Sequence, residues 1–427
     1  MRYLAEASRP ISQRTIREEN LKRIFSLLGT GREMSRAALV RATGLSPTTV
    51  SALVDEMIGA DLLVETGLEQ RAQSGRKAIN LRINPAGRQI PVFSLNRWGV
   101  RYTLYNLALE EMETLFVPHD SGQYGGFSER AQETDPDAGA DYAALLEDIL
   151  TRRSRFFDPS RADVVCVTHP GLYLEGEKAF SLSAMRVSFS HESMRSLQAR
   201  IDAPLFFVNS STRFAYAEKR CLEAEGEAGD DLIYLNVCEG VGAGIVLGGE
   251  IFTGAGDIGG EIGHVTIDYK GRKCACGSRG CLEQYVSTDA VLNAFRQAAR
   301  EDRCPGLMEL ARDSYDNITL ELIAGAYDAG LPGVRAMLGE IADILFSGLY
   351  AAVCLTGIKR VVIGGGIERL GEGFLQAIAA HAENPRHLLM KDVRVTYALS
   401  GFKGDSAGIA SYYLDKAWPI ASNGGRV

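Results

Sequence analysis

Three cysteines and one histidine lie within one short stretch, Glu261–Glu283, of this 427-residue chain. Cys274, Cys276 and Cys281 follow His264 by 10, 12 and 17 positions, and the glycines among them allow tight turns. Three thiolates and one imidazole are typical of structural zinc, because this closed tetrahedral set leaves no position for a substrate. An apolar loop with incidental cysteines is the alternative, which the density of ligands disfavours. The stretch is therefore predicted to bind zinc.

The same stretch resembles the zinc motif of the ROK family (repressors, open reading frames and kinases). In that family a Glu-x-Gly-His precedes a Cys-x-Cys-Gly-x-x-Gly-Cys-x-Glu, and every fixed position is present here. The resemblance implies an actin-like, two-lobed ATPase fold, and it is nearest to the N-acetylglucosamine and xylose repressor branch. It also implies that His264 gives one ring nitrogen to zinc and turns the other toward a sugar. Glu261 and Glu283 are then expected to bind sugar hydroxyl groups.

The composition is that of an ordinary globular protein, with 46% hydrophobic and 23% charged residues. The length predicts two or three domains. No apolar run approaches the ~20 residues that cross a bilayer, and the N-terminus lacks the apolar core of a secretory signal. The five cysteines outside the motif are scattered, as expected of buried side chains in a reducing compartment. We therefore expect a cytoplasmic protein without a membrane partner.

The two ends of the chain differ in charge. The first 90 residues carry 14 Lys/Arg and 9 Asp/Glu, a net charge of +5, whereas the remainder has −13. A basic head on an acidic body indicates an anionic partner for the head alone. Apolar periodicity predicts helices over 19–28, 34–43 and 47–60, the last two capped by Ser35 and Ser46. Two strands, 62–66 and 77–83, are expected to follow around a polar hairpin.

This order of elements predicts a winged helix-turn-helix, in which the third helix enters the DNA major groove by its N-terminal end. The GLSPTTVS turn and the SGRK wing also resemble those of the family's repressors. The expected DNA contacts are Ser46, Thr48, Thr49 and Ser51 on the helix, and Arg71, Arg76 and Lys77 on the wing. A helical protein-interaction module is the alternative, which the hydroxyl residues and basic wing disfavour.

The Asn-Pro-Ala-Gly break at 84–87 predicts a domain boundary, because these residues interrupt regular structure. We expect a DNA-binding domain at 1–86 and a ROK effector domain at 87–427. Within the latter, one lobe is expected at about 87–222 together with a C-terminal helix, and the other at about 223–400.

Two positions where the family's kinases carry catalytic carboxylates hold serine in this chain. Ser94 occupies the place of the aspartate in the phosphate loop, and Trp98 crowds the turn that follows. Ser210 replaces the general base that takes the proton of the sugar hydroxyl. Asn209 and Ser210 remain expected ligand contacts, and His169 either touches the ligand or supports the turn after it. The resemblance therefore implies a protein that is not an enzyme.

These features predict an α/β protein with a winged helix-turn-helix head and an actin-like ROK body that holds a structural zinc site. The expected function is a sugar-responsive transcriptional regulator, a repressor in its simplest form. Its expected partners are operator DNA with an inverted repeat, a small carbohydrate or derivative, and further copies of the chain in a homodimer or dimer of dimers. Two alternatives stay open: a ROK sugar kinase with an accessory DNA-binding domain, and a zinc-stabilised scaffold that binds neither sugar nor ATP.

Overall fold

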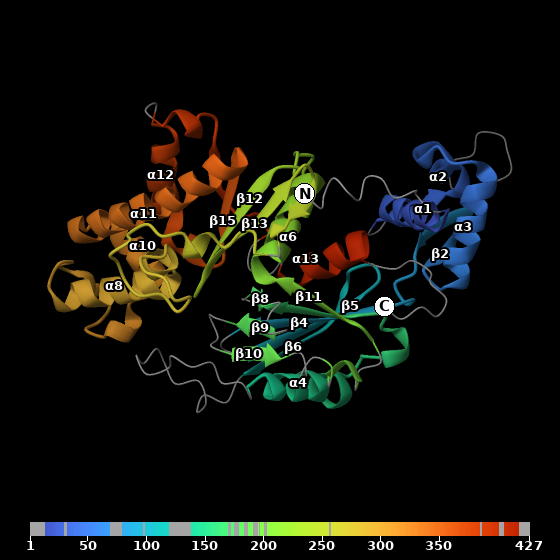
Figure 1. The fold of residues 1–427 in the computed structure, drawn as a ribbon, viewed down its shortest axis with the longest axis horizontal. Helices are drawn as coiled ribbons and strands as arrows, with labels where there is room; N and C mark the ends of the chain where they lie inside the picture. The colour runs from blue at the N-terminus through green and yellow to red at the C-terminus, as the bar shows by residue number, and fades with distance from the viewer. Residues whose placement is uncertain are drawn as a thin grey trace.

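The computed structural model has a small N-terminal head and a larger body of two lobes (Figure 1). The head, in blue, lies at the opposite end of the long axis from the helices of the second lobe, in orange and red. The structure describes residues 13–29, 32–68, 79–96, 99–118, 138–169, 172–174, 179–182, 187–190, 195, 197–199, 203–255, 258–384, 387–400 and 405–417.

The head combines three helices with a small antiparallel sheet of order β1-β3-β2. Its elements are α1 (Gln13–Leu28), β1 (Met34–Ser35), α2 (Arg36–Thr43), α3 (Pro47–Gly59), β2 (Leu63–Leu68) and β3 (Ile79–Ile83). The Ser35 hydroxyl accepts from the Ala38 N–H at 3.3 Å, and the Ser46 hydroxyl accepts from the Thr49 N–H at 3.1 Å. Both predicted caps are thereby confirmed. The pairing of β1 with β3 was not expected from the sequence.

The first lobe is built on a five-stranded sheet of order β11-β7-β4-β5-β6. Its strands are β4 (Gln89–Asn96), β5 (Gly99–Asn106), β6 (Glu111–Pro118), β7 (Val165–His169) and β11 (Leu205–Asn209), and β8 (Leu172–Leu174), β9 (Ala179–Leu182) and β10 (Val187–Ser190) form a separate small sheet. Its helices and short 3₁₀ or π turns (η) are α4 (Ala138–Asp148), η2 (Ile149–Arg153), η3 (Pro159–Arg161), α6 (Ser210–Ala224), α13 (Asp405–Tyr412) and η10 (Tyr413–Ala417).

The second lobe has a five-stranded sheet of order β14-β13-β12-β15-β16. Its strands are β12 (Leu232–Val237), β13 (Val241–Leu247), β14 (Glu250–Phe252), β15 (Arg360–Gly364) and β16 (Arg394–Tyr397). Its helices and turns are η5 (Ile262–His264), α7 (Glu283–Val286), α8 (Thr288–Arg300), α9 (Leu307–Leu310), η6 (Tyr315–Asn317), α10 (Leu320–Asp328), α11 (Pro332–Thr356), η7 (Ile367–Leu370), α12 (Gly371–Ala382) and η8 (Leu388–Met390).

The two large sheets repeat one topology. In each, the first strand pairs antiparallel with the second and parallel with the fourth: β4 with β5 and β7, and β12 with β13 and β15. The third strand extends the antiparallel side, and the fifth extends the parallel side. This duplication agrees with the two-lobed actin-like arrangement that the resemblance implies. The carboxyl ends of parallel strands meet at one edge of a sheet, which is where ligands bind in open α/β folds.

Helix α11 is long and strongly apolar. By length and composition it qualifies as a membrane-spanning helix, with a mean hydropathy of 1.6 over an 18-residue window. Half of that window is buried inside the protein, where residues such as Leu338, Leu345 and Leu349 join the core of the second lobe.

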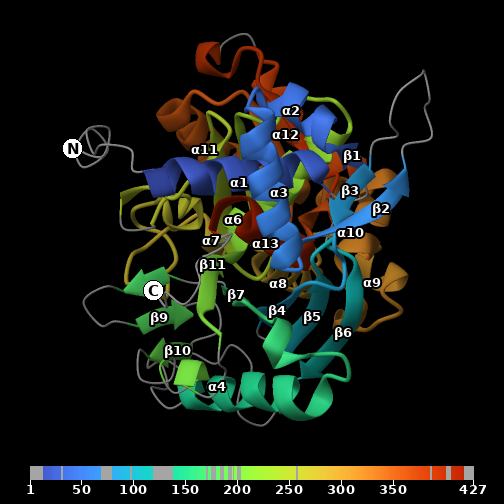
Figure 2. The same ribbon diagram turned by 90° about the vertical axis from the view of Figure 1, so that its right-hand side faces the viewer.

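The head and the first lobe share one apolar core. Side chains of α1 and α3 join residues of β4 and β7 and, from the C-terminal α13, Ile409 and Ala410 in a single buried cluster. The C-terminal helix α13 contacts β4, β5 and β7 of the first lobe as well as α6. Figures 1 and 2 show α13 near the middle of the molecule, beside α6 and facing the head.

Candidate metal and ligand site

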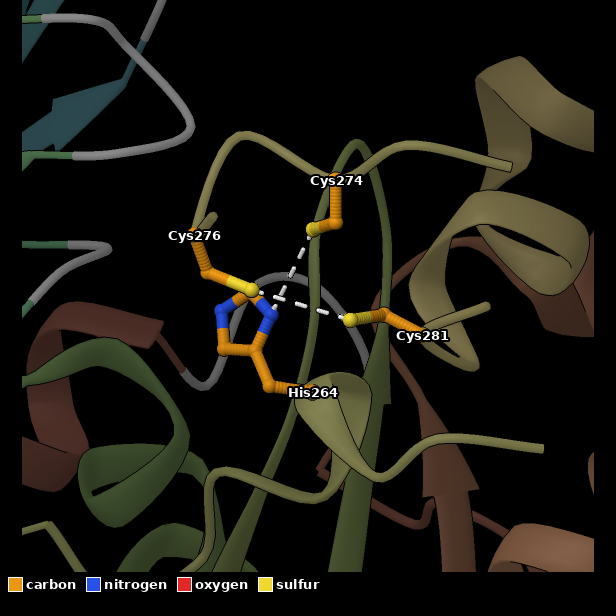
Figure 3. Close-up of side chains that lie close together, drawn as sticks. All are labelled: His264, Cys274, Cys276 and Cys281. Atoms are coloured by element: carbon orange, nitrogen blue, oxygen red, sulfur yellow. Dashed lines mark hydrogen bonds between the residues drawn. The ribbon is translucent and has the colours of Figure 1, made fainter. Parts of the chain in front are cut away.

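The four predicted metal ligands come together in the structure, as Figure 3 shows. The Cys274 thiol lies 3.7 Å from His264 Nδ1, and the Cys276 and Cys281 sulfurs are 3.6 Å apart. All four ligand atoms lie within 4.8 Å of one another. Thiolates bound tetrahedrally at ~2.3 Å from zinc would be separated by about 3.8 Å. The cluster therefore already has nearly the dimensions of a tetrahedral metal site.

Tight turns bring these ligands together in the segment 264–283, called the metal loop below. The loop crosses itself through hydrogen bonds from the Gly280 N–H to the Arg272 carbonyl at 2.7 Å and from the Ile267 N–H to the Gly280 carbonyl at 2.8 Å. Gly280 has a φ of +65°, and a Cβ there would lie 1.6 Å from the Asp268 carbonyl oxygen. Only glycine fits at this crossing.

Burial disfavours the thiolate form of two cysteines of the loop, Cys274 and Cys281. It raises the pKa of Cys274 to about 12, and it raises the pKa of Cys281 in the same direction. Cys274 and Cys281 are buried, whereas Cys276 is exposed. Because a cation must replace the protons for these sulfurs to be charged, the site is suited to a metal rather than to a free nucleophile.

The two ring nitrogens of His264 face different partners. Nδ1 faces the Cys274 sulfur, whereas Nε2 lies 3.9 Å from a carboxylate oxygen of Glu261. Burial raises the pKa of Glu261, and the nearby charge of Glu283 adds to this effect while His264 opposes it. The two ring nitrogens thus face different groups, a thiol on one side and a carboxylate on the other.

Glu283 is fixed by the start of β13. Its Oε2 accepts a hydrogen bond from the Val241 N–H at 3.0 Å. Burial raises the pKa of Glu283, and this backbone N–H lowers it in part. The segment before Glu261 also lies on β13, since a Cβ on Gly260 would be 1.9 Å from the Ala243 carbonyl oxygen. The start of β13 therefore holds the Glu283 carboxylate directly and packs against the backbone that precedes Glu261.

The other expected ligand residues begin α6, which packs on the same part of β13. The side chain of Asn209 caps α6 by accepting from the Ser211 N–H at 2.8 Å, and Ser210 is buried in its first turn. A Cβ on Gly242 would lie 2.5 Å from the Ser211 hydroxyl. His169 ends β7 and pairs in register with Asn209. The start of α6 and the two glutamates thus approach β13 within a few residues.

Arg213, which was not predicted from the sequence as a functional residue, lies between β4, β7 and α6. Arg213 is buried, and its guanidinium donates to the Thr168 hydroxyl and, at 3.2 Å, to the Ser94 hydroxyl. It also lies 4.7 Å from the centre of the Phe214 ring. In the sequence, the one indication of a buried functional arginine was its position in the first turn of a helix whose other residues are mostly buried. A buried arginine therefore lies beside Ser94, with its guanidinium within hydrogen-bond distance of the serine hydroxyl.

The residues expected to contact DNA divide into two groups. Ser46 and Thr48 are exposed, whereas Thr49 and Ser51 are partly exposed, all at the front of α3. The Ser46 hydroxyl lies 2.8 Å from the hydroxyls of both threonines. The predicted wing contacts, Arg71, Arg76 and Lys77, lie outside the described residues, as does Trp98 of the phosphate loop.

Known proteins resemble this chain over most of its length. A xylose repressor from Caldicellulosiruptor bescii is 28% identical over 353 residues, which cover 81% of this chain and 82% of that protein. A solved ROK family transcriptional regulator, a homologue of the Escherichia coli MLC protein, has a TM-score of 0.71 at 23% identity, covering 94% of this chain and 97% of that one.

A kinase gives a shorter match. A ROK family glucokinase from Streptomyces griseus, solved with glucose and AMPPNP, has a TM-score of 0.59 at 22% identity and covers 76% of this chain and 98% of that one. At such identities the two structures show the fold alone. The ROK family model itself matches residues 161–410, more than half of the chain. The chain belongs to the ROK family.

Proposed function

We propose that this protein is a cytoplasmic, sugar-responsive transcriptional regulator that acts as a repressor. Its head, residues 1–86, is a winged helix-turn-helix that binds operator DNA. Its body, residues 87–427, is a sugar-kinase-like sensor without kinase activity. The observation that carries the proposal is the joining of a basic head to a kinase-like body with serine at positions 94 and 210 and with Arg213 beside Ser94.

The geometry of α2 and α3 supports DNA binding by the head. Gly44 ends α2 in a left-handed conformation, and Ser46 starts α3 after a short turn. Val50, Leu53, Val54 and Met57 bury one face of α3, which leaves the hydroxyl groups of its N-terminal turn exposed. An exposed, polar N-terminal turn on a well-packed helix suits insertion into the major groove. The similarity to a xylose repressor over most of the chain supports the same role.

The donor and acceptor set of the body suits a polyhydroxylated ligand. Glu261 and Glu283 are partly buried carboxylates, and Asn209, Ser210 and His264 are the other expected ligand residues. Each carboxylate accepts several hydroxyl protons, and a ligand without those hydroxyls would leave buried acceptors unpaired, at ~1–3 kcal/mol apiece. We therefore infer that the effector is a small carbohydrate or a derivative of one.

The loss of kinase chemistry rests on three positions. Phosphoryl transfer requires a base for the sugar hydroxyl and a carboxylate that positions the metal of ATP. Serine supplies neither at Ser210 and Ser94, and the Arg213 guanidinium repels a divalent cation beside Ser94. The likeness to a glucokinase structure keeps a sugar kinase as the second candidate. These replacements favour a sensor over that alternative.

We assign Zn²⁺ to the cluster of His264, Cys274, Cys276 and Cys281, because its dimensions and three sulfur donors match structural zinc. When bound, the metal supplies a rigid cross-link between the loop and η5. His264 then keeps its Nε2 directed at Glu261. Glu283 follows the last metal ligand, Cys281, by two positions. The metal loop thus positions the ligand-binding carboxylates.

Selection from a random DNA library, followed by sugar titrations and an ATP turnover assay, tests the proposal. We expect an inverted-repeat operator, because a dimer reads two half-sites. We further expect one class of sugar to change operator affinity, and no sugar-dependent ATP hydrolysis. Sugar-dependent turnover would favour the kinase. A protein that binds neither sugar nor ATP would favour the zinc-stabilised scaffold.

A further inference from the structure

The three cysteines of the metal loop differ in their access to solvent. Cys274 and Cys281 are buried, whereas Cys276 is exposed. The space beside Cys276 is open as well, because a Cβ on the next residue, Gly277, would meet nothing within 4 Å. A small oxidant in solution therefore reaches the sulfur of Cys276 before it reaches the other two.

A second sulfur lies within reach of the exposed one. Figure 3 shows the side chains of Cys276 and Cys281 directed at each other, with their sulfurs 3.6 Å apart. Cys276 belongs to a turn in which the Cys274 N–H donates to the Ser278 carbonyl at 2.9 Å, whereas Cys281 follows that turn. A short movement of the exposed turn is therefore enough to join the two sulfurs.

Positive charge surrounds the same turn. Four exposed cations belong to the loop, and none of them forms an ion pair in the described part of the chain: Lys270, Arg272, Lys273 and Arg279. Lys273 and Arg279 lie opposite each other in an antiparallel bridge that closes the turn around Cys276. Like charges directly opposite each other destabilise a pair of strands. The loop therefore keeps this charge at a cost in stability.

These surroundings favour the reaction of a thiolate with an oxidant. Cysteine ligands of a bound metal are thiolates. The four cations outnumber Asp268 and the single negative charge of Zn²⁺ with three thiolates, so the surroundings of Cys276 stay positive when metal is bound. Reactive cysteines occur in exposed, electropositive places, often beside a second cysteine. A purely structural zinc site requires neither the exposure nor the charge.

We propose that Cys276 is an oxidation site, at which a peroxide joins Cys276 to Cys281 in a disulfide and thereby releases zinc. This rests on the assignment of Zn²⁺ to the cluster. The Cys276 thiolate attacks one oxygen of hydrogen peroxide, which forms a sulfenic acid and releases hydroxide. The Cys281 thiolate then attacks the sulfenic sulfur, and a second hydroxide leaves as the disulfide forms. The two sulfurs lose two electrons, and both peroxide oxygens leave as hydroxide.

The disulfide leaves His264 and Cys274 without a metal. Two ligands are too few for a structural zinc site, so the cross-link between the loop and η5 is lost. The His264 ring is then no longer fixed between the Cys274 sulfur and the Glu261 carboxylate. In the proposed regulator, oxidation therefore weakens effector binding, and reduction with added zinc restores it.

Peroxide treatment of the full, zinc-loaded chain tests this. Elemental analysis counts the zinc beforehand, and a coloured chelator reports its release, which should reach roughly one per chain. Trypsin cleaves after Lys273 and Arg279, which places Cys276 and Cys281 on different peptides. The disulfide should therefore appear as two linked peptides, and their fragmentation distinguishes Cys276 from Cys274. Dithiothreitol with added zinc should reverse both changes.

Two variants separate the role of the charges from general oxidation. Lys273→Gln combined with Arg279→Gln removes two exposed cations and keeps all four metal ligands. Zinc release should become about three- to tenfold slower in this variant, as expected for two solvent-screened charges near the sulfur. Cys354→Ser removes the other exposed cysteine, which lies on α11, and should release zinc at the wild-type rate.

Three results would overturn the proposal: zinc retained in excess peroxide, release without a disulfide between Cys276 and Cys281, or equal release rates in the wild type and the charge variant. A chain that holds no zinc before treatment would refute the metal assignment and this proposal together. None of these readouts uses a sugar or operator DNA, so they stay separate from a failure of the proposed regulatory function.

Discussion

Gly280→Ala and Gly277→Ala form a matched pair that tests how the metal loop is built. Both glycines have positive φ angles, +65° at Gly280 and +90° at Gly277. A Cβ at Gly280 would lie 1.6 Å from the Asp268 carbonyl oxygen, whereas a Cβ at Gly277 meets nothing within 4 Å. Both variants therefore place alanine at a positive φ, which costs free energy. Only Gly280→Ala also introduces a steric clash.

The expected costs follow from these distances. Alanine in the left-handed region costs ~1–2 kcal/mol, which is the whole penalty at Gly277. At Gly280 the loop must also move off the Asp268 carbonyl, and the hydrogen bonds between Gly280 and both Arg272 and Ile267 are lost. At about 1 kcal/mol for each bond, the total reaches about 3–4 kcal/mol before any residual clash.

Competition for zinc with a coloured chelator measures the difference. Since about 1.4 kcal/mol corresponds to tenfold in affinity, Gly277→Ala should weaken zinc binding by roughly 5–30-fold and Gly280→Ala by more than ~100-fold. Circular dichroism checks that both variants keep the rest of the fold. Equal zinc affinities in the two variants would refute this account of the loop.

Three further predictions concern the head and the ligand site. Ser46→Ala removes the cap of α3 and should lower the free energy of unfolding of the head by about 1 kcal/mol, measured by urea denaturation; an unchanged midpoint would mean that the cap adds nothing. Arg76→Ala should reduce the slope of log affinity against log salt by about one unit if this side chain neutralises a phosphate, and an unchanged slope would remove it from the DNA backbone. Glu261→Gln should eliminate the effect of the sugar on operator binding while ligand-free DNA affinity stays the same. A normal sugar response in that variant would exclude Glu261 from the ligand site.

Local features were predictable because they depend on neighbouring residues. Ser35 and Ser46 cap their helices as expected, and Gly44 ends α2. The metal cluster was also visible in the sequence, since its four ligands span few residues.

Features that depend on distant contacts were not predicted. The two-residue strand β1 exists only because it pairs with β3. The buried position of Arg213 results from the meeting of α6 with β4 and β7, which no local pattern records. The core that joins the head to the first lobe likewise requires α13, from the other end of the chain.

The central claim is that a sugar bound in the body controls DNA binding by the head without phosphorylation. Fluorescence anisotropy of the selected operator, during a sugar titration with and without Mg·ATP, tests it most directly. The account predicts that the sugar shifts operator affinity to the same extent in both conditions, because Ser94 and Ser210 supply no phosphoryl-transfer chemistry. A shift that occurs only when Mg·ATP is present would contradict the account.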